Sequence, residues 1–206
     1  MESRKEERIE KEKQQKKEAI LEAAARTFAK LGYDKATLND VAAEAGYSKS
    51  NLYSYFKNKD DLIAEMLSDA LEYRAEEFRK LVDRSDTAVN KLKWVVDRAF
   101  EYVAENRELM CILYAEQMRL GVFEQDSKFR ELITNDKIEA VKALTTIFHF
   151  GMESGEIRKS DPVKKAVLFL AAVGGAIMHW MNEKDTVNLD EYKQEILNIL
   201  NGWREA

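Results

Sequence analysis

The residues whose types and spacing could do chemistry gather between residues 37 and 59. Cations, hydroxyls, amides and phenols crowd this stretch, and no acid lies between Lys49 and Lys59. Such groups bind phosphate oxygens and base edges, whereas a helix made only for packing would more often contain Glu or Asp. The chemistry that they indicate is recognition of nucleic acid.

The sequence carries no signature of catalysis. Neither of the two histidines, His149 and His179, lies near the single cysteine, Cys111, in sequence. No HExxH, CxxC or GxSxG motif and no glycine-rich phosphate loop occurs. We therefore expect no enzyme, no metal site and no cofactor. A lone cysteine also excludes an intrachain disulfide and fits a reducing cytoplasm, where we expect the protein to work.

Two short helical patterns would position the polar residues. Thr37 and Ser48 can cap helices over residues 38–45 and 49–56, because a hydroxyl accepts from a free backbone N–H in the first turn. Gly46 follows the first helix, where the chain needs a left-handed residue. Two helices joined by about four residues with a glycine form a helix-turn-helix, whose second helix enters the DNA major groove. The spacing alone also fits two helices that only pack against each other. The polar face of the second helix is the feature that favours DNA binding.

Charge is spread unevenly along a chain whose net charge is −5. Residues 1–59 hold 13 Lys and Arg against 10 Asp and Glu, and the remaining residues hold 20 against 28. A mildly basic head on an acidic body suits a protein that binds selected sites at one end rather than DNA at large. Within the head, residues 1–17 are nearly all charged. They fit either a solvated extension of the first helix or a basic arm that reaches DNA.

Many separate positions from Ile20 to Leu67 agree with one known domain in a single register. They are the alanine-rich first helix, the pair Gly32–Tyr33, Thr37, the turn AEAG, the segment LYSYF and the run Lys59–Asp60–Asp61–Leu62. This stretch resembles the DNA-binding domain of TetR-family transcriptional regulators. The family often has His where this chain has Tyr55, and the tyrosine hydroxyl can still reach a phosphate.

The resemblance implies a role for each matching position. Four side chains would contact the DNA backbone: Thr37, Tyr53, Tyr55 and Lys59. Three would face base edges: Lys49, Ser50 and Asn51. Ser48 would cap the helix or touch a phosphate. Lysine can donate to guanine and asparagine can pair with adenine, so the chemistry of these side chains agrees. Core packing remains the alternative for Tyr53, and a solvated helix start for Lys59.

Helical periodicity continues to the end of the chain, which has one Pro and no alternating strand pattern. We therefore expect an all-α fold. A three-helix helix-turn-helix DNA-binding domain would span residues 1–59, of which 1–17 are the charged extension. A connecting helix would span residues 60–84, and a helical effector-binding and dimerisation domain residues 85–206.

The run from Ala166 to Trp180 is apolar on most faces, so its helix must be buried on more than one side. Gly174 and Gly175 weaken a helix and so suggest the close approach of another helix. The resemblance implies that the last two helices pair with their copies in a homodimer; burial within one subunit is the alternative. The run is too short and too interrupted for a membrane span, so we expect no membrane partner.

Aromatic and sulfur-containing side chains are more numerous in the body than a small helical domain needs. Most would be ordinary core, and some would line an effector pocket between helices, which the resemblance implies. The candidates for this pocket are Trp94, Phe100, Met110, Cys111, Tyr114, Phe148, Met152 and His179. Such a lining would favour an apolar or aromatic effector, whereas Glu116 or Asp97 would favour a cationic one.

Together these features predict a ligand-responsive, sequence-specific DNA-binding regulator. We expect a repressor that a small apolar or aromatic effector releases from a palindromic double-stranded operator. Two alternatives stay open: a constitutive DNA-binding regulator without an effector, and a helical enzyme or partner-binding protein whose helix-turn-helix is incidental. A tightly packed body without a cavity would favour the first, and failure to bind any genomic DNA would favour the second.

Overall fold

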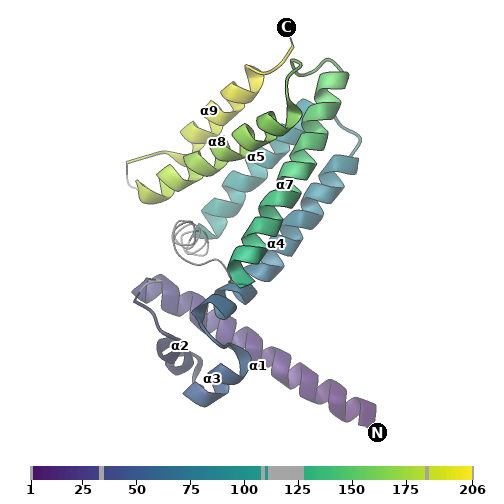
Figure 1. The fold of residues 1–206 in the computed structure, drawn as a ribbon. Coiled ribbons are helices and arrows are strands. Elements are labelled where there is room, and N and C mark those ends of the chain that lie inside the picture. Colours follow the sequence, from purple (N-terminus) through teal and green to yellow (C-terminus); the bar gives the residue numbers. More distant parts are fainter. Residues whose placement is uncertain (1, 33–34, 108–109, 111–127, 184–185, 206) are drawn as a thin grey trace. The chain divides into compact units, whose positions relative to one another are not determined.

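In the computed structural model, the described residues are 2–32, 35–107, 110, 128–183 and 186–205 (Figure 1). They form helices joined by short connections; this described part contains no strand apart from an isolated antiparallel bridge between Ile157 and Arg204. The expected all-α fold is confirmed. The chain separates into two compact units, and the first boundary along the chain falls between Ala70 and Leu71.

The first unit contains α1 (Glu2–Leu31), α2 (Leu38–Ala45), α3 (Lys49–Tyr55) and the beginning of α4 (Lys59–Asp83). From Ile20 onward the apolar positions of α1 recur every three or four residues, and this face of the helix is buried. The buried side chains of the later elements include Val41, Leu52, Phe56 and Leu62. Ala45, at the end of α2, is only half-buried.

The charged segment at the start of the chain belongs to the same helix as the apolar segment that follows it. α1 begins at Glu2, and residues 5–16 are all exposed. Glu, Lys and Gln are good helix formers, and Arg8 and Glu12 form an ion pair across one turn at 3.5 Å. Lys17 Nζ donates to Glu65 Oε1 on α4, which fixes the helix at the end of the charged segment.

The second unit contains the end of α4, α5 (Ala88–Glu105), most of α7 (Lys128–Glu153), α8 (Pro162–Asn182) and α9 (Leu189–Asn201). The helix expected over residues 108–120 lies outside the described residues. An aromatic cluster joins the helices of this unit. The ring of Phe148 on α7 meets Phe169 of α8 and Trp203 edge-on, with centroids 5.9 and 5.8 Å apart.

Side-chain caps begin two of the later helices. Thr87 Oγ1 accepts from the Asn90 N–H at 3.1 Å, at the start of α5. Asp161 accepts from the backbone N–H groups of Val163 and Lys164 at 3.0 and 3.1 Å, with proline in the first turn of α8. The Lys164 N–H is the largest cause that holds the pKa of the Asp161 carboxyl below its ordinary value.

Two polar contacts fix the end of α4 within the second unit. Arg74 forms an ion pair with Asp136 of α7. Lys91 is buried, and its Nζ donates to the Val82 carbonyl oxygen at 2.7 Å. The carbonyls of a last helical turn lack partners within the helix, and this ammonium satisfies one of them. α4 therefore enters one unit and ends in the other without a break, and the predicted domain boundaries at residues 59 and 84 stay a prediction.

α8 has the length and apolar composition of a helix that could cross a membrane, and the core helix of a soluble protein has the same properties. The expectation that this run does not span a membrane stays a prediction. α8 packs on α5 and α9, and Ala166, Phe169 and Ile177 are buried. The outer side of this helix, which includes Val163, Val167 and Leu168, remains exposed in one copy.

Candidate nucleic-acid interface

The turn between α2 and α3 has the geometry that the sequence predicts. Gly46 has φ 72° and ψ 21°, a left-handed conformation that residues with a Cβ rarely adopt. Its N–H donates to the Ala43 carbonyl at 3.2 Å, and the Tyr47 N–H donates to the Ala42 carbonyl at 2.9 Å. These bonds satisfy the last carbonyls of α2 and turn the chain toward Ser48, which begins the next helix.

α3 presents one continuous polar face. Leu52 and the following Phe56 are buried on its inner side. The exposed side chains of the helix recur four residues apart, which places them together on the outer side: Lys49, Ser50, Tyr53 and Ser54. Lys57 is exposed just after the helix. Asn51 and Tyr55 are half-buried at the edges of this face. Tyr53 is 45% exposed, so packing in the core does not account for it.

Short-range bonds order the side chains of this polar face. Ser48 Oγ accepts from the Asn51 N–H at 3.3 Å and lies 3.2 Å from Ser50 Oγ. Ser54 Oγ donates to the Asn51 carbonyl oxygen at 2.6 Å. Lys49 Nζ lies 5.9 Å from the centroid of the Tyr53 ring, one turn further along the helix. Ser48 therefore acts as the cap, and the lysine and the tyrosine support each other at the surface.

The hydroxyl of Thr37 is engaged within the protein. It accepts from the Asp40 N–H at 3.3 Å and donates to Asp40 Oδ2 at 2.6 Å, and the Thr37 N–H donates to the same oxygen at 2.9 Å. The hydrogen bond from the Thr37 side chain is the largest cause that lowers the pKa of the Asp40 carboxyl. A phosphate that approached Thr37 would compete with Asp40 for both donors.

Lys59 joins two helix beginnings. Its Nζ donates to the Ala36 carbonyl oxygen at 3.1 Å, directly before the cap of α2. At the start of α4, Asn58 Oδ1 accepts from the Asp61 N–H at 2.7 Å, and Asp61 accepts from the Lys57 N–H at 3.2 Å. The structure therefore brings Thr37 and Lys59 together, although 22 residues of sequence separate them. The DNA-contacting roles of these residues and of the predicted residues on α3 stay a prediction.

Exposure identifies two further residues beside the predicted contacts. Ser54 shares the exposed face of α3 with Lys49 and Tyr53, and Lys57 is exposed just after the helix, beyond the extended backbone of Phe56. Both side chains are candidates for phosphate contacts.

The side chains predicted to line an effector pocket fall into three groups. Phe100, Met110, Phe148 and Met152 are buried. Trp94 is half-buried, and His179 is exposed with its ring 5.6 Å from that of Tyr192. Cys111 and Tyr114 lie outside the described residues. Phe148 belongs to the aromatic cluster with Phe169 and Trp203, where it serves as core.

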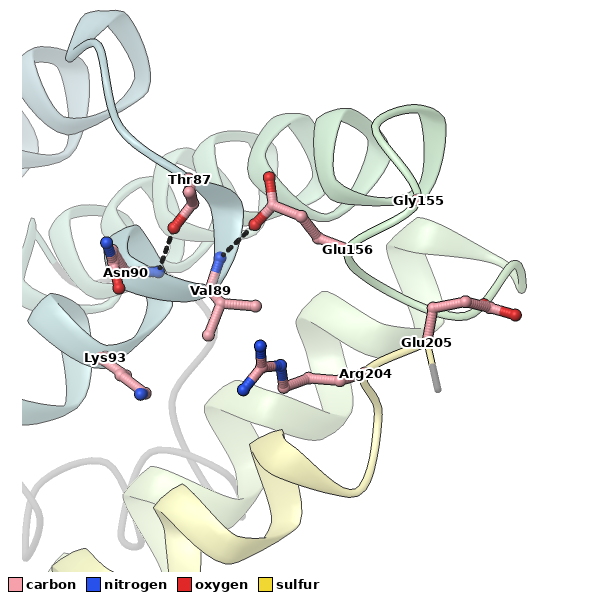
Figure 2. Close-up of a pocket in the computed structure, with 8 residues that line it drawn as sticks. All are labelled: Thr87, Val89, Asn90, Lys93, Gly155, Glu156, Arg204 and Glu205. Atoms are coloured by element: carbon pink, nitrogen blue, oxygen red, sulfur yellow. Dashed lines mark hydrogen bonds between the residues drawn. The ribbon is translucent and has the colours of Figure 1, made fainter.

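Two surface hollows of the second unit contain none of these predicted side chains. The first has a volume of about 360 Å³ and is shown in Figure 2; its lining is Thr87, Val89, Asn90, Lys93, Gly155, Glu156, Arg204 and Glu205. Glu156 Oε2 occupies one side of it and accepts from the Val89 N–H at 3.2 Å. The second, of about 470 Å³, lies beside Lys91, Ile147 and Phe150. The predicted effector pocket therefore stays a prediction.

Among the described residues, no group of three or more His, Cys, Asp and Glu side chains could hold a metal ion. The polar groups that α3 presents are hydroxyls, an amide and the ammonium group of Lys49, with the beginnings of α2 and α4 beside it. This arrangement can bind a phosphate backbone and donate to base edges.

Comparison with known proteins agrees with that chemistry. Residues 20–66 match the family model described as bacterial regulatory proteins, tetR family. The fatty acid metabolism regulator protein of Bacillus subtilis is 24% identical over 191 residues, which cover 92% of this chain and 96% of that protein. The HTH-type transcriptional repressor KstR2 of Mycolicibacterium smegmatis is 25% identical over 188 residues, with 91% and 89% covered.

A solved structure shows the same fold. The transcriptional regulator FadR from Bacillus subtilis, in complex with stearoyl-CoA, has a TM-score of 0.72 against this chain. Its sequence is 22% identical, and the match covers 88% of this chain and 96% of that one. The N-terminal helix-turn-helix and the C-terminal helical body therefore form one known architecture.

Proposed function

The chain is a TetR-family transcriptional regulator and not an enzyme, and from this premise we propose that it is a homodimeric repressor released from a palindromic operator by a small effector. The observation that carries the proposal is the exposed face of α3, which presents a lysine, two serines and a tyrosine without an acid. One such helix reads few base pairs, so two copies related by a two-fold axis would read a palindrome. Binding to genomic DNA would place the protein in the cytoplasm.

Within this proposal, the roles of the residues follow from their exposure and their partners. Lys49, Ser50 and Asn51, in the first turn of α3, would face base edges. The hydroxyls of Tyr53 and Tyr55 would contact phosphates. Ser48, Thr37 and Lys59 would act mainly by fixing the beginnings of the three helices, since each already has a partner within the protein. A backbone contact by Thr37 or Lys59 would come from the helix beginning that it orders.

A row of exposed apolar residues on α8 supports dimerisation through the last two helices. Val163, Val167, Ala171 and Gly175 are all exposed and follow one another at intervals of four residues. Such spacing places them on one side of the helix. A Cβ added to Gly175 would meet nothing within 4 Å in the same chain. A second copy of α8 would cover this row and would explain a glycine there better than burial within one subunit.

The proposed effector is apolar or aromatic. Support comes from the buried apolar character of Phe100, Met110 and Met152, and from the relative that was solved with stearoyl-CoA. The effector would enter the body and shift α4, so that two recognition helices would no longer match major grooves about 34 Å apart. The effector would shift the equilibrium between the DNA-binding and the released conformation only by the difference between its binding free energies for these two conformations. A constitutive regulator without an effector is the second candidate, supported by the close aromatic packing around Phe148.

A binding experiment on selected DNA tests the proposed function. Genomic fragments that the full chain retains define an operator, and two substitutions on α3 then separate base contacts from phosphate contacts. Asn51→Ala should relax the preference at one base position, at a cost of about 1–3 kcal/mol for the preferred base. Tyr53→Phe removes only a hydroxyl and should weaken binding to all sequences alike.

Sequence profiles of the selected DNA give the measurement. Identical profiles for the two variants would contradict the assignment of Asn51 to a base edge. Retention of no genomic fragment at all would contradict DNA binding itself and would favour a helix-turn-helix that only packs.

A further inference from the structure

The N-terminal part of α1 is a helix that its own unit leaves in solvent. Residues 5–16, here termed the arm, are all exposed and carry a charge at most positions. In Figure 1 this purple part of α1 extends well beyond α2 and α3. An isolated helix of this length is marginal in water. The arrangement of its charges indicates what surface it would contact.

The charges of the arm are sorted onto two faces. Because each residue of an α-helix turns by about 100°, four cations fall within an arc of about 140°. They are Lys5, Arg8, Lys11 and Lys16. The same arc holds one acid, Glu12, which is paired with Arg8 at 3.5 Å. The opposite side of the arm carries Glu6, Glu7 and Glu10 together with Lys13.

Contacts further along α1 show in which direction each face points. Arg26 follows Arg8 by 18 residues, or about five turns, so the two lie on one line along the helix. Arg26 Nε donates to Glu44 Oε1 of α2 at 2.9 Å. Lys17 lies about two and a half turns before Arg26, on the opposite side, and bonds to Glu65 of α4. The basic face is therefore on the side of the helix-turn-helix, and the acidic face is on the side of α4.

We propose that the basic face of the arm is a second contact with double-stranded DNA, made to phosphates beside the segment that α3 reads. The inference rests on the proposed function, because α3 must dock before the arm is brought to the duplex. Arg8 lies about 27 Å along α1 from Arg26, so the contacts fall at most about eight base pairs from the position of Arg26, at 3.4 Å per step. Phosphates attract cations whatever the sequence, so the arm adds affinity and salt dependence without selecting bases.

The first test compares two substitutions that remove the same charge from opposite faces. Lys11→Gln acts on the basic face and Lys13→Gln on the other, only two residues away. The probes are the selected operator and a random-sequence duplex, each of about 40 base pairs, or roughly four helical turns. For Lys11→Gln the slope of log affinity against log salt should become shallower by about 0.9 for each phosphate that the arm no longer neutralises, on both duplexes. Lys13→Gln should keep the wild-type slope.

A second pair of variants tests a gain of affinity, which partial unfolding cannot imitate. Glu12→Gln removes the one acid of the basic face and should strengthen binding roughly twofold to fivefold, the size of a surface charge pair. Glu10→Gln, on the acidic face, should leave the affinity unchanged. Circular dichroism of all four variants should give the wild-type helix content.

The outcomes separate this inference from the proposed function. Equal salt slopes for Lys11→Gln and Lys13→Gln, with the operator still selected over random DNA, would overturn the arm contact alone. Equal affinities for Glu12→Gln and Glu10→Gln would overturn it as well. If the wild-type chain bound neither duplex, both the arm contact and the proposed function would be wrong.

Discussion

Gly151 shows how a single missing atom sets the packing of the second unit. A Cβ at this position on α7 would lie 2.6 Å from Ala88 Cβ and 2.8 Å from Ile157 Cδ1. Contacts this short do not occur between carbon atoms, so the beginning of α5 and the segment after α7 approach α7 only because residue 151 has no side chain. The backbone N–H groups of Glu156 and Ile157 also donate to the Gly151 carbonyl at 2.9 Å.

At the scale of this residue we predict that Gly151→Ala is destabilising. Overpacking should lower the free energy of unfolding by about 1–3 kcal/mol, measured by urea denaturation. Ile157→Val, which removes the Cδ1 that the new Cβ would strike, should cost about 0.5–1.5 kcal/mol alone. In the double variant the loss should be smaller than the sum of the two, since the collision is partly removed. Additive losses would show that the close approach is not the cause.

Among the elements, α8 differs most between its apolar composition and the burial of its side chains within one copy. It is the most apolar helix of the described chain, yet Leu168 is 59% exposed and the row from Val163 to Gly175 has no cover within one copy. A contiguous apolar surface of this kind is typical of an interface. α9 adds Ile199, also exposed, from the neighbouring helix.

For this element we predict that Leu168→Glu dissociates the dimer. Each copy would bring an unpaired carboxylate into the interface, so the dimer dissociation constant should rise by at least about a hundredfold. The control is Ile138→Glu on α7, where an apolar side chain that is 45% exposed receives the same charge. Sedimentation velocity at several protein concentrations gives the measurement. Dissociation by both variants, or by neither, would argue against α8 as the interface.

On the scale of the whole molecule, the proposed repressor couples two binding events. A coupling free energy is reciprocal: if an effector weakens operator binding by some factor, the operator weakens effector binding by the same factor. We predict a factor of about 5–150, the range common for such coupling. Stearoyl-CoA serves as the first probe, with titrations of probe into free and operator-bound protein. A probe that binds the chain but leaves operator affinity unchanged at saturation would favour the constitutive regulator.

Sequence alone predicted the helix-turn-helix because its signals are local. The hydroxyl of Ser48 and the glycine at position 46 act within a few residues, and the structure has them in the predicted geometry. Partners from distant segments could not be predicted in that way. The bond from Lys59 to the Ala36 carbonyl depends on the folded first unit, and it changes the expected role of that lysine.

Amino-acid composition does not show which aromatic side chains are buried in the core and which line a cavity. Phe148 and Trp94 are both aromatic residues of the body, but Phe148 packs between two other rings and Trp94 is half-buried. Which of the two faces a hollow depends on how the helices pack. For the arm, the two charged faces were already present in the sequence spacing. The side to which they point became known only from the bond between Arg26 and Glu44.

The unbroken course of α4 has a consequence for anyone who wishes to exchange the head of this protein for another. The first boundary between the compact units falls inside a helix of 25 residues, between Ala70 and Leu71, and not in a loop. A chimera must therefore be joined in helical phase. One residue added or removed at the junction would rotate the later turns of α4 by about 100° and shift them by about 1.5 Å along the axis. Swapped heads should regulate only when their junction keeps the residue count of α4.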